Sequence, residues 1–458
     1  MIHTSNSHGL SKSRTHRRTT VLVLGWCACV MLARPHTALA QATAQIPLQF
    51  DFLDPGARSL ALGSAFVAVA DDATAAFTNP AGLTYLIKPE VSAEFRGRRL
   101  ETPYLSGGRL SGTVTNIGAD TIPEPVYESS IDSMFQPYFV SFVYPGRRWA
   151  VAAYRHELVR QENEFSSTGP FLSVNLGDGS TTTVREFALS GTRTIKIDNY
   201  GGAVAYRANT MFAAGIGVAF YKLDLDADFA RFSFQGSTFG PVDYTAPTAT
   251  NTQRGDNTAV GVNVGLIITP SPVARVAAVY RQGISLDFSQ TDKVGSADPL
   301  VRDGQFRTPG VIGIGLRIQP RDSWSMSVDY DRVQYSRLKE DFISFQAIST
   351  GTQDQLEIED GNEFHFGVEY VFTRVSYTPA IRGGIWYDPD HAVRYVSDNS
   401  NSAVDIRLKA TLPGGEDLVH YTFGFGMPLA PAFEFNIGAD FSKQRRYASA
   451  SVVARFGK

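Results

Sequence analysis

The feature that most constrains this chain is an alternation of apolar and polar residues with a period of two, which recurs over most of its length after about residue 87. Residues 433–442 show it most clearly, because Phe, Ile and Ala there alternate with polar residues or glycine. The same alternation occurs in residues 324–331, 364–372 and 419–427. Successive side chains of a β-strand point to opposite faces. Each segment is therefore predicted to form a strand with one aromatic-rich apolar face and one polar face.

The connections between these predicted strands alternate in length. The short ones are Pro145–Arg147, Ala208–Asn209, Pro270–Pro272, Pro320–Asp322, Thr373–Arg374 and Leu429–Pro431. The long ones cover about 100–136, 160–184, 228–256, 288–304, 337–361 and 388–416, with a shorter seventh at 443–445. Seven connections on one side and six tight turns on the other predict 14 strands. Bacterial outer-membrane barrels combine an even strand number with short periplasmic turns and long extracellular loops.

One predicted strand does not fit a single membrane crossing. We place the strands at about 88–99, 137–145, 147–160, 185–207, 210–228, 256–269, 273–288, 304–319, 322–337, 361–372, 376–388, 417–428, 432–442 and 446–456. The fourth exceeds the roughly 9–11 residues that cross a bilayer as a strand. It is expected either to extend above the membrane or to contain a separate loop hairpin at Arg185–Ser190.

A soluble β-sandwich or propeller would also show alternating strands, but three features favour a membrane barrel. Phe and Tyr gather near the strand ends, as the aromatic girdles of a barrel require. The polar face carries charges that a packed sandwich core would not hold. No repeat at propeller spacing is present. The predicted fold class is all-β, a 14-stranded antiparallel transmembrane β-barrel with an N-terminal, partly helical hatch.

Residues 1–40 have the features of a secretory signal peptide. A basic start is followed by an apolar stretch at 21–33, and Ala38-Leu39-Ala40 fits the small-residue cleavage rule. The apolar stretch is well short of the ~20 residues that a membrane-spanning helix needs. Cleavage after Ala40 removes both cysteines and five basic residues, which takes the formal net charge from −3 to −8.

The remaining composition argues against several classes of function. Without cysteine there is no disulfide or thiol chemistry, and an acidic chain is a poor nucleic-acid binder. The four remaining histidines are far apart in sequence, so neither a metal site nor a cofactor is expected. His156-Glu157 lacks the second histidine of a zinc helix, and no G-x-S-x-G elbow is present. The sequence therefore predicts no enzyme.

Residues 56–83 form the most apolar and least charged stretch after the leader, GARSLALGSAFVAVADDATAAFTNPAGL. The order Gly-Ala-Arg, then LGSAFVAVADDATA, then Asn79-Pro80-Ala81-Gly82-Leu83 resembles the N-terminal hatch signature of the FadL/TodX outer-membrane transport family. That resemblance implies a hatch at 41–86 inside a barrel at 87–458. Within the hatch, Asp71-Asp72 is expected to cap a helix over 73–78, and Asn79-Pro80 is expected to end it.

The resemblance also implies a function, a location and partners. Such proteins take up hydrophobic molecules passively across the bacterial outer membrane, and both termini are expected in the periplasm. The implied ligands are fatty acids, hydrocarbons or detergent-like lipids, which pass from an outer site to a lumenal pocket. Rearrangement of the hatch then opens a route, often sideways through the barrel wall. Lipopolysaccharide and the barrel-assembly machinery are further expected partners, and the protein is expected to be a monomer.

The sequence offers three sets of candidate site residues. The hatch motif consists of Asn79, Pro80, Ala81 and Gly82. An apolar segment ahead of it could line a ligand pocket or only pack the hatch against the barrel wall: Ile46, Leu48, Phe50, Phe52 and Leu53. Arginines in the polar register could receive a ligand carboxylate bidentately, although pairing with acidic residues of the barrel is the simpler role: Arg96, Arg155, Arg281, Arg317 and Arg382.

Two other functions remain open at this point. A shuttle-like barrel of type IX secretion, which binds protein substrates, shares the Gly-Ala-Arg and Asn-Pro-Ala-Gly-Leu signature. A general porin has the same barrel pattern but is expected to lack a hatch. Saturable uptake of a hydrophobic molecule with little ion conductance would distinguish the transporter from both.

Overall fold

The computed structural model describes residues 53–176, 178–339 and 355–457. The predicted signal peptide at 1–40 and the first part of the predicted hatch, 41–52, lie outside the described residues. Everything described belongs to one compact unit, Thr43–Lys458. None of the helices in these ranges is long and apolar enough to cross a membrane.

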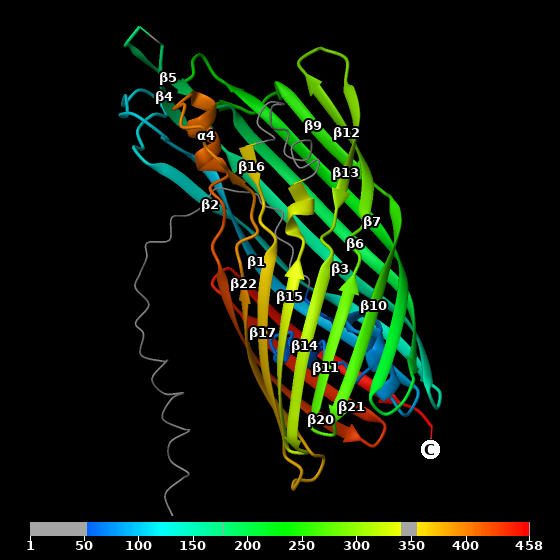
Figure 1. Cartoon of the computed structure of the whole chain (residues 1–458). Helices are drawn as coiled ribbons and strands as arrows, with labels where there is room; N and C mark the ends of the chain where they lie inside the picture. Colours follow the sequence, from blue (N-terminus) through cyan, green and yellow to red (C-terminus); the bar gives the residue numbers. More distant parts are fainter. Residues whose placement is uncertain (1–52, 177, 340–354, 458) are drawn as a thin grey trace, which may run out of the picture. The chain divides into compact units, whose positions relative to one another are not determined.

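Fourteen antiparallel strands form a closed ring, as the sequence predicts (Figure 1). Each strand pairs with its neighbours along the chain, and the last strand pairs with the first from Glu90–Arg455 to Leu100–Arg445, which closes the barrel. The ring consists of β1 (Glu90–Gly108), β2 (Pro125–Pro145), β3 (Trp149–Ser167), β6 (Ala188–Arg207), β7 (Phe212–Phe234), β10 (Thr258–Ser271), β11 (Ala274–Arg281), β14 (Val311–Arg321), β15 (Trp324–Val333), β17 (Gly361–Val371), β18 (Ala380–Asp388), β20 (Leu418–Ala430), β21 (Phe433–Phe441) and β22 (Arg445–Arg455).

The faces of the strands confirm the predicted membrane barrel. In β7, Phe212, Ile216 and Phe220 are exposed on the outer face. Inside the barrel, Asp329 and Asp440 have no exposed surface. Large apolar side chains outside and charged ones inside are the reverse of a soluble protein and match a barrel in lipid.

Above the lipid-facing belt, the distribution of side chains between the two faces is reversed: charged residues face outward and apolar residues face inward. On β7 the outward residues become Lys222, Asp224 and Asp226, while Leu223 and Leu225 point inward and are buried. Strands of 19 to 23 residues, β1, β2, β3, β6 and β7, are longer than a bilayer requires. The barrel wall therefore continues beyond the lipid into water, with an apolar interior there.

Several connections expected as loops are strands in this upper part. The added strands are β8 (Val242–Asp243), β9 (Ala249–Gly255), β12 (Ser285–Val294) and β13 (Leu300–Arg307). The connection expected at 100–136 is shorter, because β1 continues to Gly108 and β2 begins at Pro125. Of the two alternatives for the fourth strand, the extension above the membrane is confirmed, whereas the hairpin expected at Arg185–Ser190 is wrong, because Ala188–Ser190 already belong to β6. β4 (Phe171–Asn175) and β5 (Thr181–Arg185) form a hairpin of their own, while β6 begins at Ala188 and extends above the membrane.

The outer end carries the remaining short elements (Figure 1). They are η3 (Tyr335–Lys339), the small sheet of β16 (Leu356–Glu357) and β19 (Arg394–Tyr395), and α4 (Ala403–Thr411). Leu338, Leu356, Tyr395 and Leu408 are buried in one apolar cluster. The loops therefore have a packed core, and they partly cover the outer mouth of the barrel.

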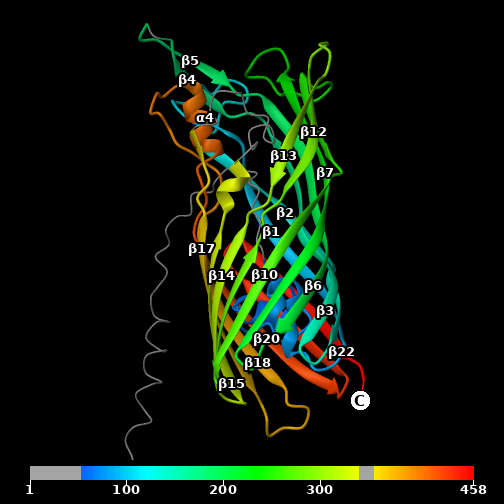
Figure 2. The same cartoon turned by 45° about the vertical axis from the view of Figure 1, so that its right-hand side comes forward.

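Residues 53–86, which we call the hatch segment, lie inside the ring toward the end with the tight turns (Figure 2). The segment contains α1 (Ala57–Ala61), α2 (Ala75–Thr78) and η2 (Pro80–Tyr85). Helix α2 starts two residues later than expected, and neither Asp71 nor Asp72 is its N-cap. Instead, the Asp72 carboxylate accepts a hydrogen bond from the Thr74 N–H, at 2.9 Å.

Glycines of the barrel wall make room for the hatch segment. A Cβ atom added to Gly384 would lie 2.5 Å from the backbone nitrogen of Gly63, and one added to Gly438 would lie 2.4 Å from the Ala57 carbonyl oxygen. Real side chains do not approach backbone atoms so closely. The lumenal glycines whose added Cβ would lie within 3 Å of a backbone or side-chain atom of the hatch segment are Gly215, Gly265, Gly315, Gly367, Gly384, Gly424 and Gly438.

Candidate functional site

The motif Asn79-Pro80-Ala81-Gly82 fixes the backbone of the hatch segment. Asn79 is extended, with φ −152°, which ends α2 before the proline. Its Oδ1 accepts from the Ala81 N–H at 3.2 Å, and its Nδ2 donates to the Val67 carbonyl at 2.9 Å. A Cβ on Gly82 would lie 1.9 Å from the Ala70 carbonyl oxygen. All four motif residues are buried, so the observed contacts give the motif a structural role.

A network of partly buried ion pairs fastens the hatch segment to the wall. Arg58 of α1 binds Glu369 of β17 with two hydrogen bonds of 3.0 Å and Asp71 with one of 2.6 Å. Asp71 also faces Arg317 at 3.1 Å and Arg275 at 3.5 Å. Burial alone would raise the pKa of the Asp71 carboxyl, but these guanidinium groups hold it well below its usual range.

Four of the five candidate arginines face the lumen, and each is already engaged with an acidic residue. Arg96 pairs with Glu94 at 2.7 Å. Arg281 pairs with Asp54 at 2.8 Å and Arg317 with Asp71 at 3.1 Å. Arg382 pairs with Glu369 at 2.6 Å. A ligand carboxylate would therefore have to displace a partner.

Arg155 does not face the lumen as expected. It shares the outward register of Val151 and Ala153 on β3, whereas Tyr154 and His156 point inward. Its guanidinium pairs with Asp198 and donates to the Pro137 carbonyl at 2.8 Å. The expectation that Arg155 faces the lumen is therefore wrong, because the odd-numbered residues of β3 up to Arg155 lie on its outer face.

Leu53 is the one residue of the predicted apolar pocket segment within the described part; Ile46, Leu48, Phe50 and Phe52 lie outside it. Leu53 and Arg96 both line a cavity of about 50 Å³. That volume accommodates a few water molecules and is too small for a fatty-acid chain. Its walls come from the hatch segment and from strands β1, β2, β3 and β22: Leu53, Arg96, Arg98, Leu100, Gln136, Tyr138, Glu157, Leu158, Val159, Arg160 and Tyr447.

The cavity lies where the barrel wall is incomplete. Strands β2 and β3 pair only between Phe139–His156 and Pro145–Ala150. Beyond this point, within the described residues, β2 continues to pair with β1 alone and β3 with β6 alone. Register shifts at Glu94/Phe95 on β1 and at Glu157/Val159 on β3 mark the place. Such irregularities bend strands and end their pairing. We call the interval between 125–138 and 157–167 the wall gap.

Side chains, not a backbone ladder, bridge the wall gap. The Glu162 N–H donates to the Asp132 carboxylate at 3.1 Å, and the Glu164 N–H donates to the Ser130 hydroxyl at 3.0 Å. Arg160 donates to the side-chain carbonyl of Gln136 at 3.0 Å. The gap can therefore open with less disruption than the paired wall.

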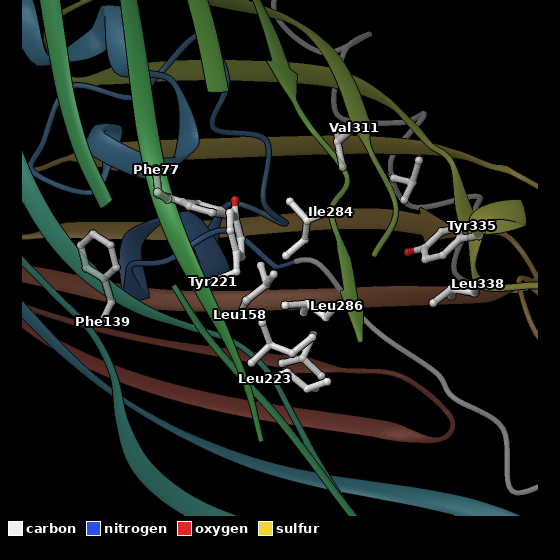
Figure 3. Close-up of a cluster of buried hydrophobic side chains, with 14 of the residues drawn as sticks. Phe77, Phe139, Leu158, Tyr221, Leu223, Ile284, Leu286, Val311, Tyr335 and Leu338 are labelled. Carbon is white, nitrogen blue, oxygen red and sulfur yellow. The ribbon is translucent and has the colours of Figure 1, made fainter. Parts of the chain in front are cut away.

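A run of buried apolar side chains leads from the outer loops down toward the hatch segment (Figure 3). We call it the apolar column; it consists of Leu158, Leu223, Ile284, Leu286, Val311, Tyr335 and Leu338. All belong to the same apolar cluster as Phe77 of the hatch segment. Leu158 belongs to the apolar column and also lines the cavity at the wall gap. An apolar path thus connects the outer loops, the hatch segment and the gap.

The sequence pattern predicts neither the wall gap nor the apolar column. The β7 segment carried one signal, because its apolar residues change register from Phe220 and Val218 to Leu223 and Leu225. That change predicts an apolar interior above the membrane. The gap depends on bulges at Leu158 and Tyr138, which the alternation of apolar and polar residues does not predict.

Comparison with known proteins gives consistent results. A family model described as outer membrane protein transport protein (OMPP1/FadL/TodX) matches residues 158–401. No curated protein matches the sequence significantly. A Pseudomonas aeruginosa FadL homologue superposes with a TM-score of 0.61 at 14% identity, covering 89% of this chain and 100% of that one.

Two toluene transporters have a similar fold. TbuX of Ralstonia pickettii gives a TM-score of 0.57 at 16% identity, and TodX of Pseudomonas putida gives 0.56 at 14%. Each alignment covers 89% of this chain and 100% of the other. The family model covers more than half of the chain, and the fold is a closed 14-stranded barrel with a partly helical N-terminal region. The chain therefore belongs to the OMPP1/FadL/TodX family of transport proteins, which are multi-pass β-barrels of the bacterial outer membrane.

Proposed function

We propose that this protein carries hydrophobic molecules, such as long-chain fatty acids or aromatic hydrocarbons, passively across the outer membrane. The proposed route begins at the outer loops, follows the apolar column and leaves the barrel sideways through the wall gap. The interrupted pairing of β2 and β3, with a cavity directly behind it, is the observation that carries this proposal. The related FadL homologue and toluene transporters support the class of ligand.

The apolar column is chemically suited to this task. Burying apolar surface is favourable by roughly 25 cal/mol per Å². A ligand that buries on the order of 200 Å² would thus gain about 5 kcal/mol before the costs of binding. The cavity beside Leu53 is smaller than such a ligand, so uptake requires side chains at the gap or the hatch segment to move. We propose that residues 41–86 act as the movable hatch and that 87–458 form the barrel that holds it.

The orientation and the partners are part of the same proposal. Glu90 at the start of β1 pairs with Arg455 at the end of β22, on the side of the tight turns, which supports a periplasmic position for both ends. Arg99 and Arg446 face each other across β1 and β22, next to the lipid-facing Phe441, where they could meet lipopolysaccharide phosphates. We propose further that the barrel-assembly machinery inserts the protein, that it acts as a monomer after removal of residues 1–40, and that it has no enzymatic activity.

Locking the wall gap tests the proposed exit. Gln136 and Glu157 lie on opposite sides of the gap with their side chains in contact. We expect a Gln136→Cys/Glu157→Cys pair, joined by a short bifunctional thiol reagent, to lose saturable uptake of labelled oleate and toluene in proteoliposomes. Cleaving the cross-link with a reducing agent should restore uptake.

A matched pair on the intact ladder provides the control. Phe142 and Ala153 lie directly opposite each other on β2 and β3 below the gap. Joining Phe142→Cys to Ala153→Cys should leave uptake unchanged, because that part of the wall is already closed. Undiminished uptake through the protein locked at Gln136→Cys/Glu157→Cys would contradict a lateral exit.

A further inference from the structure

Three inward-facing polar residues form a row across the wall, next to the wall gap. His156 on β3 lies directly opposite Asn199 on β6, and Asn199 lies directly opposite Tyr221 on β7. We call these three residues the polar row. His156 also belongs to the last residue pair before the gap, opposite Phe139. The row therefore borders the place where the β2–β3 ladder ends.

Two members of this row, His156 and Asn199, have buried side-chain polar atoms that lack a well-formed hydrogen bond in the described part of the chain. His156 has no exposed surface, and within the described residues neither ring nitrogen has a hydrogen-bond partner. Asn199 is likewise fully buried, and neither of its amide atoms makes a hydrogen bond of good geometry, although the hydroxyls of Tyr154 and Tyr221 lie nearby. Unpartnered buried polar groups destabilise a fold, so their presence in a native protein requires an explanation.

Aromatic rings enclose the His156 imidazole. The ring centroid of Phe77, from the hatch segment, lies 4.4 Å from that of His156, and the Tyr138 ring lies 4.9 Å away. Phe77 and Tyr221 lie close together, and Leu158, Leu223 and Ile284 of the apolar column lie beside them (Figure 3). The polar row therefore lies beside both the apolar column and the wall gap.

The chemistry of the row indicates what it binds. Imidazole, amide and phenol groups offer hydrogen-bond donors and acceptors without a fixed charge. The neighbouring cation, Arg281, packs over Phe77 and is already paired with Asp54 at 2.8 Å. Arg96, the other inward-facing cation near His156, is paired with Glu94 at 2.7 Å. Among the described residues a carboxylate would thus find both of these cations occupied, whereas a hydroxyl or carbonyl group would satisfy the unpaired His156 nitrogens.

We propose that the polar row is a binding site for the neutral polar group of an otherwise apolar ligand, such as an aromatic or aliphatic alcohol or ketone. This inference rests on the proposed function and narrows its substrate class. Entry of the ligand displaces Phe77, and the ligand's hydroxyl or carbonyl oxygen then pairs with His156 and Asn199. The ligand thereby satisfies polar groups that stay unpaired while Phe77 covers them.

Three probes with one aromatic ring test the site: toluene, benzyl alcohol and benzoate, each measured as saturable binding to the full-length protein in lipid nanodiscs. Wild-type protein should bind benzyl alcohol at least tenfold more tightly than toluene or benzoate. In His156→Phe the ratio of the benzyl alcohol and toluene affinities should fall to about one. Asn199→Leu should reduce the same ratio, which covers the case in which His156→Phe folds poorly.

A stability measurement separates a binding role from a structural one. Phe fits an aromatic cage and leaves no unpaired nitrogen, so His156→Phe should raise resistance to thermal unfolding. His420→Phe is the matched control. This buried lumenal histidine, unlike His156, has a hydrogen bond between its Nδ1 and the Asp440 carboxylate, at 2.7 Å. This control should lower thermal stability and keep the wild-type affinity ratio.

An unchanged ratio in His156→Phe, or equal binding of the three probes to wild type, would overturn the inference. The absence of saturable binding of any probe would overturn the proposed function for small aromatic ligands as well.

Discussion

At the scale of single residues, Asn79 and Asp71 hold the hatch segment in place by different contacts. Asn79-Pro80 ends a helix as the residue before proline should, and the sequence alone predicts this. Asp71 was expected to cap a helix, yet it binds Arg58, Arg275 and Arg317 instead. Two of those arginines are more than 200 positions away, so only the closed barrel brings them to the carboxylate.

The Asp71 ion pairs make attachment of the hatch segment dependent on pH. Three guanidinium groups lower the pKa of this carboxyl despite its burial, so the ion pairs are fully formed above the usual aspartate value of about 4. Their stabilisation is lost as the pH falls through the lowered value. We expect Asp71→Asn to conduct ions several-fold better than wild type at pH 7 in planar bilayers, and the difference to shrink in acid. Asp224→Asn, which changes an outward aspartate, should behave as wild type. Equal conductance of wild type and Asp71→Asn at pH 7 would contradict this role.

At the scale of elements, the alternation of short and long connections predicted the number of strands, and the two-residue period predicted most of their faces. It did not predict where strands end, because residues above the membrane keep the same period while the apolar face turns inward, as on β7. The strand ends at the wall gap depend on bulges, which arise from pairing between strands and leave no periodic signal. The lumenal glycines were visible in the sequence, but their role needed the position of the hatch segment.

Two adjacent glycines on β18 test how the hatch segment is seated. A Cβ on Gly384 would collide with the Gly63 backbone, whereas a Cβ on Gly383 meets no atom closer than the Thr422 carbonyl oxygen at 3.7 Å. We expect Gly384→Val to displace the hatch segment and raise ion conductance, while the barrel still migrates as a folded species in cold detergent electrophoresis. Gly383→Val should retain the low conductance of wild type. Similar conductance in both variants would show that the hatch segment does not depend on this contact.

At the scale of the whole molecule, the barrel combines a lipid-facing belt, a filled lumen and one interrupted seam. A porin needs an open aqueous lumen, but here the hatch segment fills the ring near its tight turns. A secretion shuttle has no need for an apolar column that ends at a wall gap. These features together favour a carrier of small hydrophobic molecules over either alternative.

The most direct test measures hydrophobic flux and ion conductance on the same intact protein. Proteoliposomes should take up labelled toluene or oleate with saturation kinetics, because the ligand must occupy the apolar column before it reaches the gap. The same preparation in planar bilayers should conduct few ions, because the hatch segment fills the lumen. Strong conductance with uptake that does not saturate would indicate a porin. Low conductance without uptake of any hydrophobic molecule would contradict the transport function proposed for this protein.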